Sequence, residues 1–159
     1  MISLRNALEQ MAWADDAFFS FLQELPDDAW RVKAGPDEWH VAALTFHLVA
    51  STDWYRFQLG GSIQFTEEPT SIAEVRGLQE TWREINRFLI AQADLDDEVV
   101  HWEEDGQHFS STRATVLTQV LIHAVEHRAH IAWALKVNGF PSPDLEDFTA
   151  WAYEKRDRT

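Results

Sequence analysis

The sequence feature that most limits the possible folds is the recurrence of apolar residues at spacings of three and four along four long segments. In the first segment the spacing continues until Pro26 and comprises Leu4, Leu8, Met11, Phe18, Leu22 and Leu25. Such a period places apolar side chains on one face of an α-helix. Similar stripes predict helices over residues 39–59, 71–93 and 112–138. Amphipathic helices must bury their apolar faces against one another, which predicts an all-α fold, a four-helix bundle.

Capping residues mark the ends of these helices. Ser3 precedes the first helix, Asp37 the second, and Ser111 or Thr112 the fourth. These side chains can accept hydrogen bonds from the free N–H groups of a first helical turn. Ser71 with Glu74 three residues later forms a capping box for the third helix. Residues 26–36 and 60–70 are then predicted to be loops.

Two smaller elements accompany the four helices. Asp105-Gly106 lies between short β-favouring stretches, so residues 99–109 predict a small hairpin before the fourth helix, with His101 and His108 on its two arms. Gly139 is a helix-end signal. Beyond it, Asp144 is predicted to cap a short C-terminal helix whose packing face comprises Leu145, Phe148, Trp151 and Ala152.

Composition restricts the class of protein. A chain of 159 residues predicts one domain over residues 1–159, with a substantial core. The formal net charge of −14 repels phosphate backbones and anionic membranes, which argues against nucleic-acid or membrane binding. No signal-peptide pattern and no run of about 18–20 apolar residues is present, so we expect a cytoplasmic protein. Without cysteine, a metal site must use His, Asp, Glu and water.

Two histidines in the fourth predicted helix are candidate metal ligands. His123 and His127 are four residues apart, so they lie on the same helical face. Their row is otherwise apolar and reads Val116, Val120, His123, His127, Ile131 and Ala134. An unpaired buried polar group costs about 1–3 kcal/mol, and one shared ion would satisfy both imidazoles. The spacing alone is a weak signal, because other chains contain such pairs without a metal.

A third histidine lies on an apolar face of another predicted helix. The row there reads Ala43, Phe46 or His47, Ala50, Trp54 and Phe57. Considered alone, a core histidine such as His47 is more often hydrogen-bonded than bound to metal. If this face packs against the first pair, three imidazoles can hold Zn, Ni or Fe with positions left open for a substrate. His40, in the first turn of this helix, is expected to be exposed or to cap it.

Acidic residues near these histidines have several interpretations. Zinc proteases place Glu directly after the first His of such a pair, whereas this chain has Ala124, so that class is excluded. Glu126 would either hold a ligand ring or pair with a basic residue in solvent. Asp15 interrupts the first apolar stripe, and we expect it at the stripe's edge, with a place near the site as the alternative.

The sequence resembles the DinB/YfiT-like superfamily over most of its length. The resemblance is carried by Trp13-Ala14-Asp15-Asp16 with Leu25-Pro26-Asp27, by Glu38-Trp39-His40-Val41-Ala42 with Phe46-His47-Leu48, and by His123-Ala124-Val125-Glu126-His127-Arg128. It implies a four-helix bundle, often dimeric, in which His47, His123 and His127 bind a divalent metal. Many members continue with Arg-Gly-Gln, whereas this chain has Arg128-Ala129-His130, which leaves His130 as an accessory ligand candidate.

The resemblance also implies an activity. Characterised members are thiol-dependent enzymes that use bacillithiol, mycothiol or glutathione for S-transfer or isomerisation, so we expect a small-molecule electrophile and a low-molecular-weight thiol as partners. A metal-dependent hydrolase and a non-catalytic, metal- or ligand-binding stress-response protein are the alternatives. Arg128 would contact an anionic group of the cosubstrate or form a surface ion pair. Trp54 is the candidate pocket aromatic, and a homodimer is expected.

Overall fold

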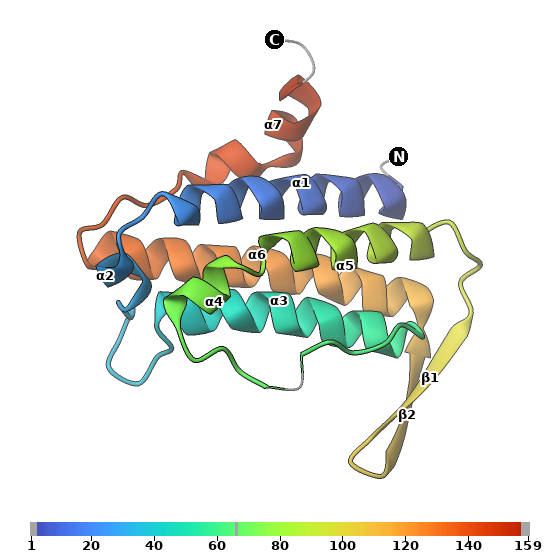
Figure 1. Cartoon of the computed structure of the whole chain (residues 1–159). Helices are drawn as coiled ribbons and strands as arrows, with labels where there is room; N and C mark the ends of the chain where they lie inside the picture. The colour runs from blue at the N-terminus through green and yellow to red at the C-terminus, as the bar shows by residue number, and fades with distance from the viewer. Residues whose placement is uncertain (1–2, 66, 157–159) are drawn as a thin grey trace.

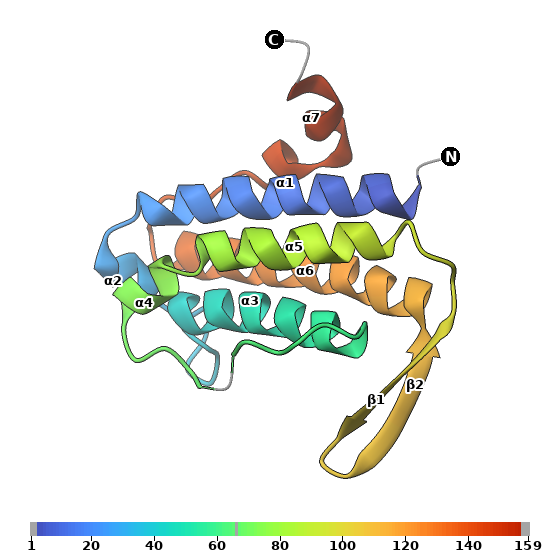
Figure 2. The ribbon, with the colours of Figure 1, turned by 45° about the vertical axis from the view of Figure 1, so that its right-hand side comes forward.

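Four long helices lie side by side and form the body of the protein (Figure 1). They are α1 (Leu4–Gln23), α3 (Val41–Gln58), α5 (Gln79–Gln92) and α6 (Arg113–Val137) in this computed structural model, which describes residues 3–65 and 67–156. Helix α3 packs antiparallel to α6, and α1 packs antiparallel to α5 (Figures 1 and 2). The protein is therefore a helical bundle, as the apolar periodicity predicted. The ends of the predicted domain lie outside the described residues.

Short elements connect and extend these helices. They are α2 (Asp27–Trp30), α4 (Ile72–Arg76), strands β1 (Val99–Glu104) and β2 (Gln107–Thr112), the 3₁₀ helix η1 (Leu145–Phe148) and α7 (Ala150–Lys155). The predicted loop over residues 26–36 was therefore partly wrong, because it contains α2. Burial explains this helix: Trp30 is fully buried in the core, and one turn of helix directs it inward.

The third predicted helix is interrupted. Helix α4 ends at Arg76 with Gly77 as its C-cap, and α5 begins at Gln79, so the continuous helix expected over residues 71–93 is wrong. Glycine has a low helix propensity, which weakens the segment at this point. The capping box is present in a shifted form: Ser71 accepts from the Glu74 N–H at 3.3 Å, while the Glu74 carboxylate accepts from the Thr70 N–H at 2.6 Å.

Most of the other predicted helix ends are confirmed. Ser3 caps α1, Thr112 caps α6, and Gly139 follows α6 with φ +74°. The second helix begins at Val41 rather than near residue 39, and its cap is His40 instead of Asp37. His40 is exposed, as expected. It also caps the helix, as the alternative prediction had it, because its Nδ1 accepts from the Ala43 N–H at 2.9 Å.

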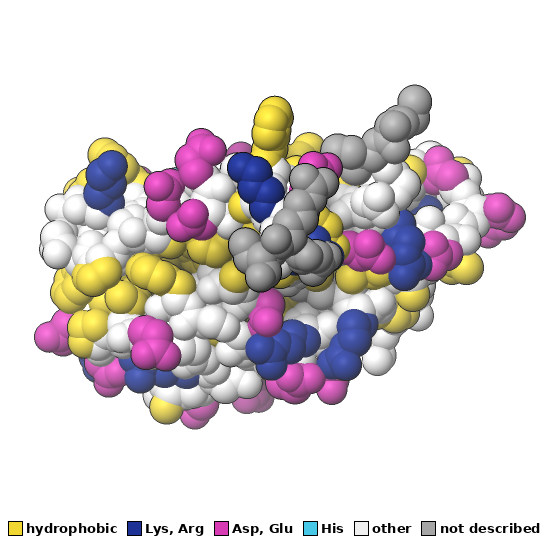
Figure 3. Space-filling model, turned by 90° about the horizontal axis from the view of Figure 1, so that it is seen from above, with side chains coloured by type: hydrophobic (Ala, Val, Ile, Leu, Met, Phe, Trp, Pro, Cys, Tyr) yellow, Lys and Arg dark blue, Asp and Glu magenta, His cyan; other side chains and the backbone are white. Residues whose placement is uncertain are grey.

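The C-terminal prediction was only partly right. Asp144 caps η1, and a second cap, Thr149, starts α7. Trp151 does not pack: it is 77% exposed on a helix that projects from the bundle (Figure 1). On the face that carries α7, acidic and basic side chains are interspersed, with hydrophobic side chains exposed between them (Figure 3).

The predicted hairpin is confirmed. Strands β1 and β2 pair antiparallel and extend beyond the helices, as Figure 2 shows. The pair Glu104–Gln107 closes a two-residue turn in which Asp105 and Gly106 have φ of 49° and 73°. Two positive φ values match a type I′ turn, whose twist suits a hairpin. His101 and His108 are on opposite arms, exposed and not paired with each other.

The core consists of two apolar clusters, one toward each end of the bundle. Met11, Leu48 and Ala124 belong to one cluster, and Phe18, Leu44 and Ile131 belong to the other. Polar side chains lie between the clusters on three of the long helices, at Asp15, His47, His127 and Arg128. No helix within residues 3–65 and 67–156 is long and apolar enough to cross a membrane.

Candidate metal centre

Helix α6 supplies two of the candidate ligands. The row that contains His123 and His127 is otherwise buried, as predicted, at Val116, Val120, Ile131 and Ala134. Both imidazoles are half-buried, and their ring centroids lie 4.2 Å apart. One helical turn separates them, so the packing of α6 against α3 directs both toward the same neighbour.

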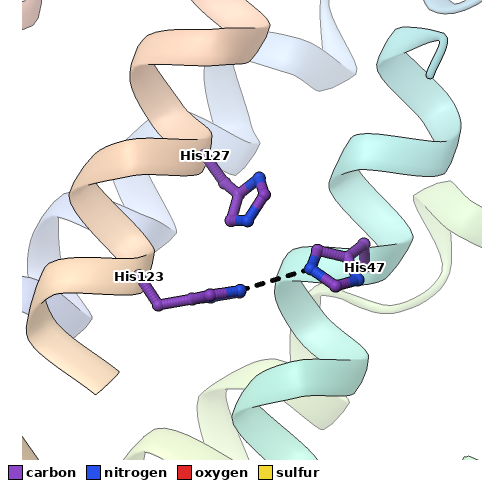
Figure 4. A group of neighbouring side chains, drawn as sticks. All are labelled: His47, His123 and His127. Atoms are coloured by element: carbon purple, nitrogen blue, oxygen red, sulfur yellow. Dashed lines mark hydrogen bonds between the residues drawn. The ribbon is translucent and has the colours of Figure 1, made fainter. Parts of the chain in front are cut away.

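Helix α3 supplies the third imidazole. The His47 ring lies 4.7 Å from the His127 ring and 5.2 Å from the His123 ring, centroid to centroid. The Nε2 atoms of His47 and His123 are 3.2 Å apart, and the three rings point toward one another (Figure 4). The structure therefore brings together the three histidines predicted from the sequence, although His47 and His127 are 80 positions apart in the chain.

The predicted inner row of α3 was wrong, although His47 itself was placed well. The buried residues of α3 include Leu44, Leu48 and Thr52, whereas Ala43, Phe46, His47, Ala50, Trp54 and Phe57 are all only partly buried. Helix α3 is apolar on most sides, so its sequence period did not identify the inward face. The consequence is that His47 lies at the margin of the core, where a bound ion would be accessible.

Electrostatics keep the three imidazoles neutral. Burial, with smaller effects of His127 and His47, lowers the pKa of His123 to about 4. Burial also lowers the pKa of His47, and burial together with the neighbouring His47 and His130 lowers that of His127. Metal ions bind the neutral form of imidazole, so these shifts favour coordination at neutral pH.

The donor atoms fit one divalent ion. One nitrogen of each ring lies within 4.8 Å of the others, so the cluster can hold a metal. Two nitrogens at about 2.0–2.1 Å from a tetrahedral zinc are about 3.3 Å apart, close to the observed 3.2 Å between His47 and His123. Within the described residues, His127 Nδ1 is buried without a hydrogen-bond partner. Hydrogen bonds among the rings thus leave one nitrogen unsatisfied.

Three further side chains border the cluster. The Ser51 hydroxyl lies 3.3 Å from His47 Nε2, and the Trp39 ring lies 4.8 Å from the His47 ring. The Tyr55 ring lies 5.8 Å from that of His123. None of the three was predicted from the sequence as a neighbour of the histidines. Ser51 and Tyr55 follow His47 by four and eight residues, so helical spacing was the signal available for these two.

Other predicted neighbours lie outside the cluster. His130 is exposed, with its ring centroid 6.0 Å from that of His127, and Glu126 is exposed as well. His130 is not among the grouped ligands. The Trp54 ring packs against the rings of Tyr55 and Trp102, and Trp54 is not among the residues that line the cavity beside His47, so the expectation that it lines the pocket was wrong.

Asp15 and Arg128 form a buried ion pair. Arg128 donates to the Asp15 carboxylate, and the two side chains are only 5% and 1% exposed. The edge position expected for Asp15 and the surface ion pair given as one alternative for Arg128 were therefore wrong, because both side chains lie inside the bundle. Burial raises the pKa of Asp15 to about 6 against the opposing effect of Arg128, so the carboxylate is ionised at neutral pH.

Comparison with known families agrees with this geometry. The sequence matches the model of the DinB family over residues 1–157. The protein belongs to the DinB family. This confirms the resemblance inferred from the histidine and tryptophan motifs. No protein with curated annotation matches the chain. Membership in the DinB family and the three-histidine cluster together support a metal-binding DinB/YfiT-like protein.

Proposed function

We propose that this DinB-family protein is a four-helix-bundle enzyme that depends on a divalent metal ion held by His47, His123 and His127. The observation that carries the proposal is the convergence of three neutral imidazoles from two helices, with donor atoms within 4.8 Å of one another. Zn, Ni and Fe are the candidate ions, since each accepts imidazole nitrogen. Three protein ligands are typical of catalytic sites, which keep positions open.

A thiol-dependent reaction is the preferred chemistry. A divalent ion in such a site lowers the pKa of a bound water or thiol and so supplies a nucleophile near neutral pH. The chain has no cysteine, so the thiol must be a cosubstrate. In S-transfer the thiol sulfur forms a bond to an electrophilic carbon, while the leaving group departs with its electron pair and the thiol proton passes to solvent. Isomerisation would begin with the same addition and end by releasing the thiol.

The residues of this chain have defined tasks in the proposal. The three imidazoles bind the ion, and their neutral state at pH 7 keeps them available. The partial exposure of His47 leaves one side of the site open to a small molecule. The Ser51 hydroxyl also lies 3.5 Å from His47 Nδ1, the ring nitrogen left free when Nε2 binds the ion, and would orient the ring from there. No side chain is assigned as general acid or base.

Metal analysis tests the site. The His123→Ala protein, purified beside the wild type, should contain far less metal by elemental analysis because a ligand is missing. His108→Ala is the matched control, since His108 is exposed on the hairpin and should not change the metal content. Stoichiometric metal in folded His123→Ala protein would refute the assignment.

A panel of electrophiles tests the reaction. Turnover that requires an added low-molecular-weight thiol would support S-transfer or isomerisation. Equal turnover with and without every thiol would replace this proposal by metal-dependent hydrolysis. Stoichiometric metal binding without turnover of any electrophile would favour the third alternative, a non-catalytic metal- or ligand-binding protein.

A further inference from the structure

We propose that the cavity beside His47 binds a small molecule with a single carboxylate and an apolar body, the carboxylate being held by Arg31 and His40. The inference rests on the proposed function, because it names the class of substrate that would reach the same centre. The cavity has a volume of about 900 Å³ and is bounded by α2, the start of α3 and residues 68–75. Its size suits a small molecule.

Arg31 provides an unpaired positive charge on the cavity wall. It is exposed, and within residues 3–65 and 67–156 its guanidinium has no hydrogen bond or ion pair. Asp27, which lines the same cavity, is already paired with Arg76 at 3.1 Å. Arginine binds carboxylates through parallel N–H donors, so an unpaired guanidinium at a cavity favours that class of ligand.

His40 adds a second donor on the same wall. Its Nδ1 accepts the Ala43 N–H at 2.9 Å, so the ring proton must be on Nε2, which is therefore a donor. The chain before His40 runs back past Arg31, because the Val41 N–H donates to the Val32 carbonyl at 3.0 Å. Two donors on adjacent backbone segments match the two oxygens of one carboxylate.

The remaining wall limits the ligand to one anionic group. Glu68, which also lines the cavity, is an exposed carboxylate and would repel a second negative charge. The rest of the lining includes Trp39, Phe46, Ala50 and Ile72, which suits an apolar body. Trp39 links the cavity to the metal centre, since its ring lies 4.8 Å from the His47 ring. A ligand held at Arg31 would thus extend along Trp39 toward His47.

Phenylacetate and its neutral amide, phenylacetamide, are suitable probes because they share the apolar body and differ in the charge. Binding is measured by calorimetry with the full chain, both metal-loaded and after chelation. The chelated protein matters because a carboxylate can also bind an ion directly. We expect phenylacetate to bind more tightly than phenylacetamide in both forms. The Arg31→Gln protein should lose about tenfold in phenylacetate affinity and nothing for the amide.

Lys33→Gln is the matched control, because Lys33 is an exposed cation two residues away that does not line the cavity. It should leave both affinities unchanged, whereas Trp39→Ala should weaken both probes equally. Equal affinity of the wild type for the two probes, no binding of either, or equal losses in the Arg31 and Lys33 variants would overturn the inference. Failure of the metal proposal would appear separately, as metal retained by His123→Ala.

Discussion

Arg128 follows the candidate ligand His127 directly in α6, and it donates to the buried carboxylate of Asp15 on α1. Asn86 of α5 donates to the other Asp15 oxygen at 3.3 Å, so three helices meet at one carboxylate. Successive helical residues point about 100° apart, so with Arg128 fixed toward α1, His127 is directed to a different face, toward α3. The ion pair therefore fixes the rotation of α6 that the metal centre requires.

Replacing Asp15 by Ala should destabilise the protein by about 3–5 kcal/mol, because the charge of Arg128 would stay buried without a partner. The free energy of unfolding, measured by urea denaturation, checks this. Asp16 provides the matched control: it pairs with Arg83 at 2.6 Å, but both side chains are substantially exposed. Asp16→Ala should change stability by less than about 1 kcal/mol. Similar losses in the two variants would contradict a structural role for the buried pair.

The buried ion pair of Asp15 and Arg128 could not be predicted from the sequence. Asp15 interrupts the apolar stripe between Met11 and Phe18, and a single carboxylate there is compatible with either an edge or a buried position. Its partner, Arg128, is 113 residues away in the sequence, and the spacing of apolar residues within one helix contains no information about such a distant contact. In the structure Asp15 lies between Met11 of one apolar cluster and Phe18 of the other, and Arg128 lies between Ala124 and Ile131 in the same way.

The histidine cluster could be predicted because each ligand broke an otherwise apolar pattern and the family resemblance joined them. Helix α6 has a clear apolar row around His123 and His127, so its inward face was predicted correctly. Helix α3 is apolar on most sides, so the prediction of its inward face was wrong. Trp39 was missed as a neighbour of His47 because it precedes the helix, where no period applies.

Metal content should distinguish His127 from His130, which lie on the same helix. His127→Ala should lose most of its metal, whereas His130→Ala should retain it, because the exposed His130 is not among the grouped donors. Elemental analysis of both variants, with circular dichroism to verify folding, makes the comparison. Metal loss in the His130 variant would add that residue to the ligand set and contradict the three-histidine site.

The metal-free protein should lose stability as the pH falls. The pKa of His123 is 6.5 in the unfolded chain and about 4 in the folded protein. Within this window the unfolded chain binds a proton that the folded protein does not, so protonation favours unfolding, and the effect is absent above pH 6.5. Unfolding free energies measured in chelator from pH 7 to pH 4 should therefore fall more steeply for the wild type than for His123→Gln.

The variant is needed because Asp15 acts in the opposite direction. Its pKa is raised from 3.8 to about 6 by burial, so between these two pH values the folded protein binds a proton that the unfolded chain does not, and this group adds stability as the pH falls. Both proteins retain Asp15, and their difference isolates the histidine. Parallel stability curves for the wild type and His123→Gln would show that His123 is not shifted by folding.

The N-terminal cap of α6 should contribute to stability without affecting the metal. Thr112 Oγ1 accepts the Thr115 N–H at 3.2 Å, and its loss in Thr112→Ala should cost about 1 kcal/mol. Thr118 is the control: its hydroxyl donates to the Ala114 carbonyl within the helix at 2.7 Å and caps nothing. Thr118→Ala should be neutral or slightly stabilising, since alanine has the higher helix propensity. Urea denaturation compares the two variants, and equal effects would contradict the cap.

Both variants should bind metal like the wild type, because His123 lies more than one helical turn beyond either threonine.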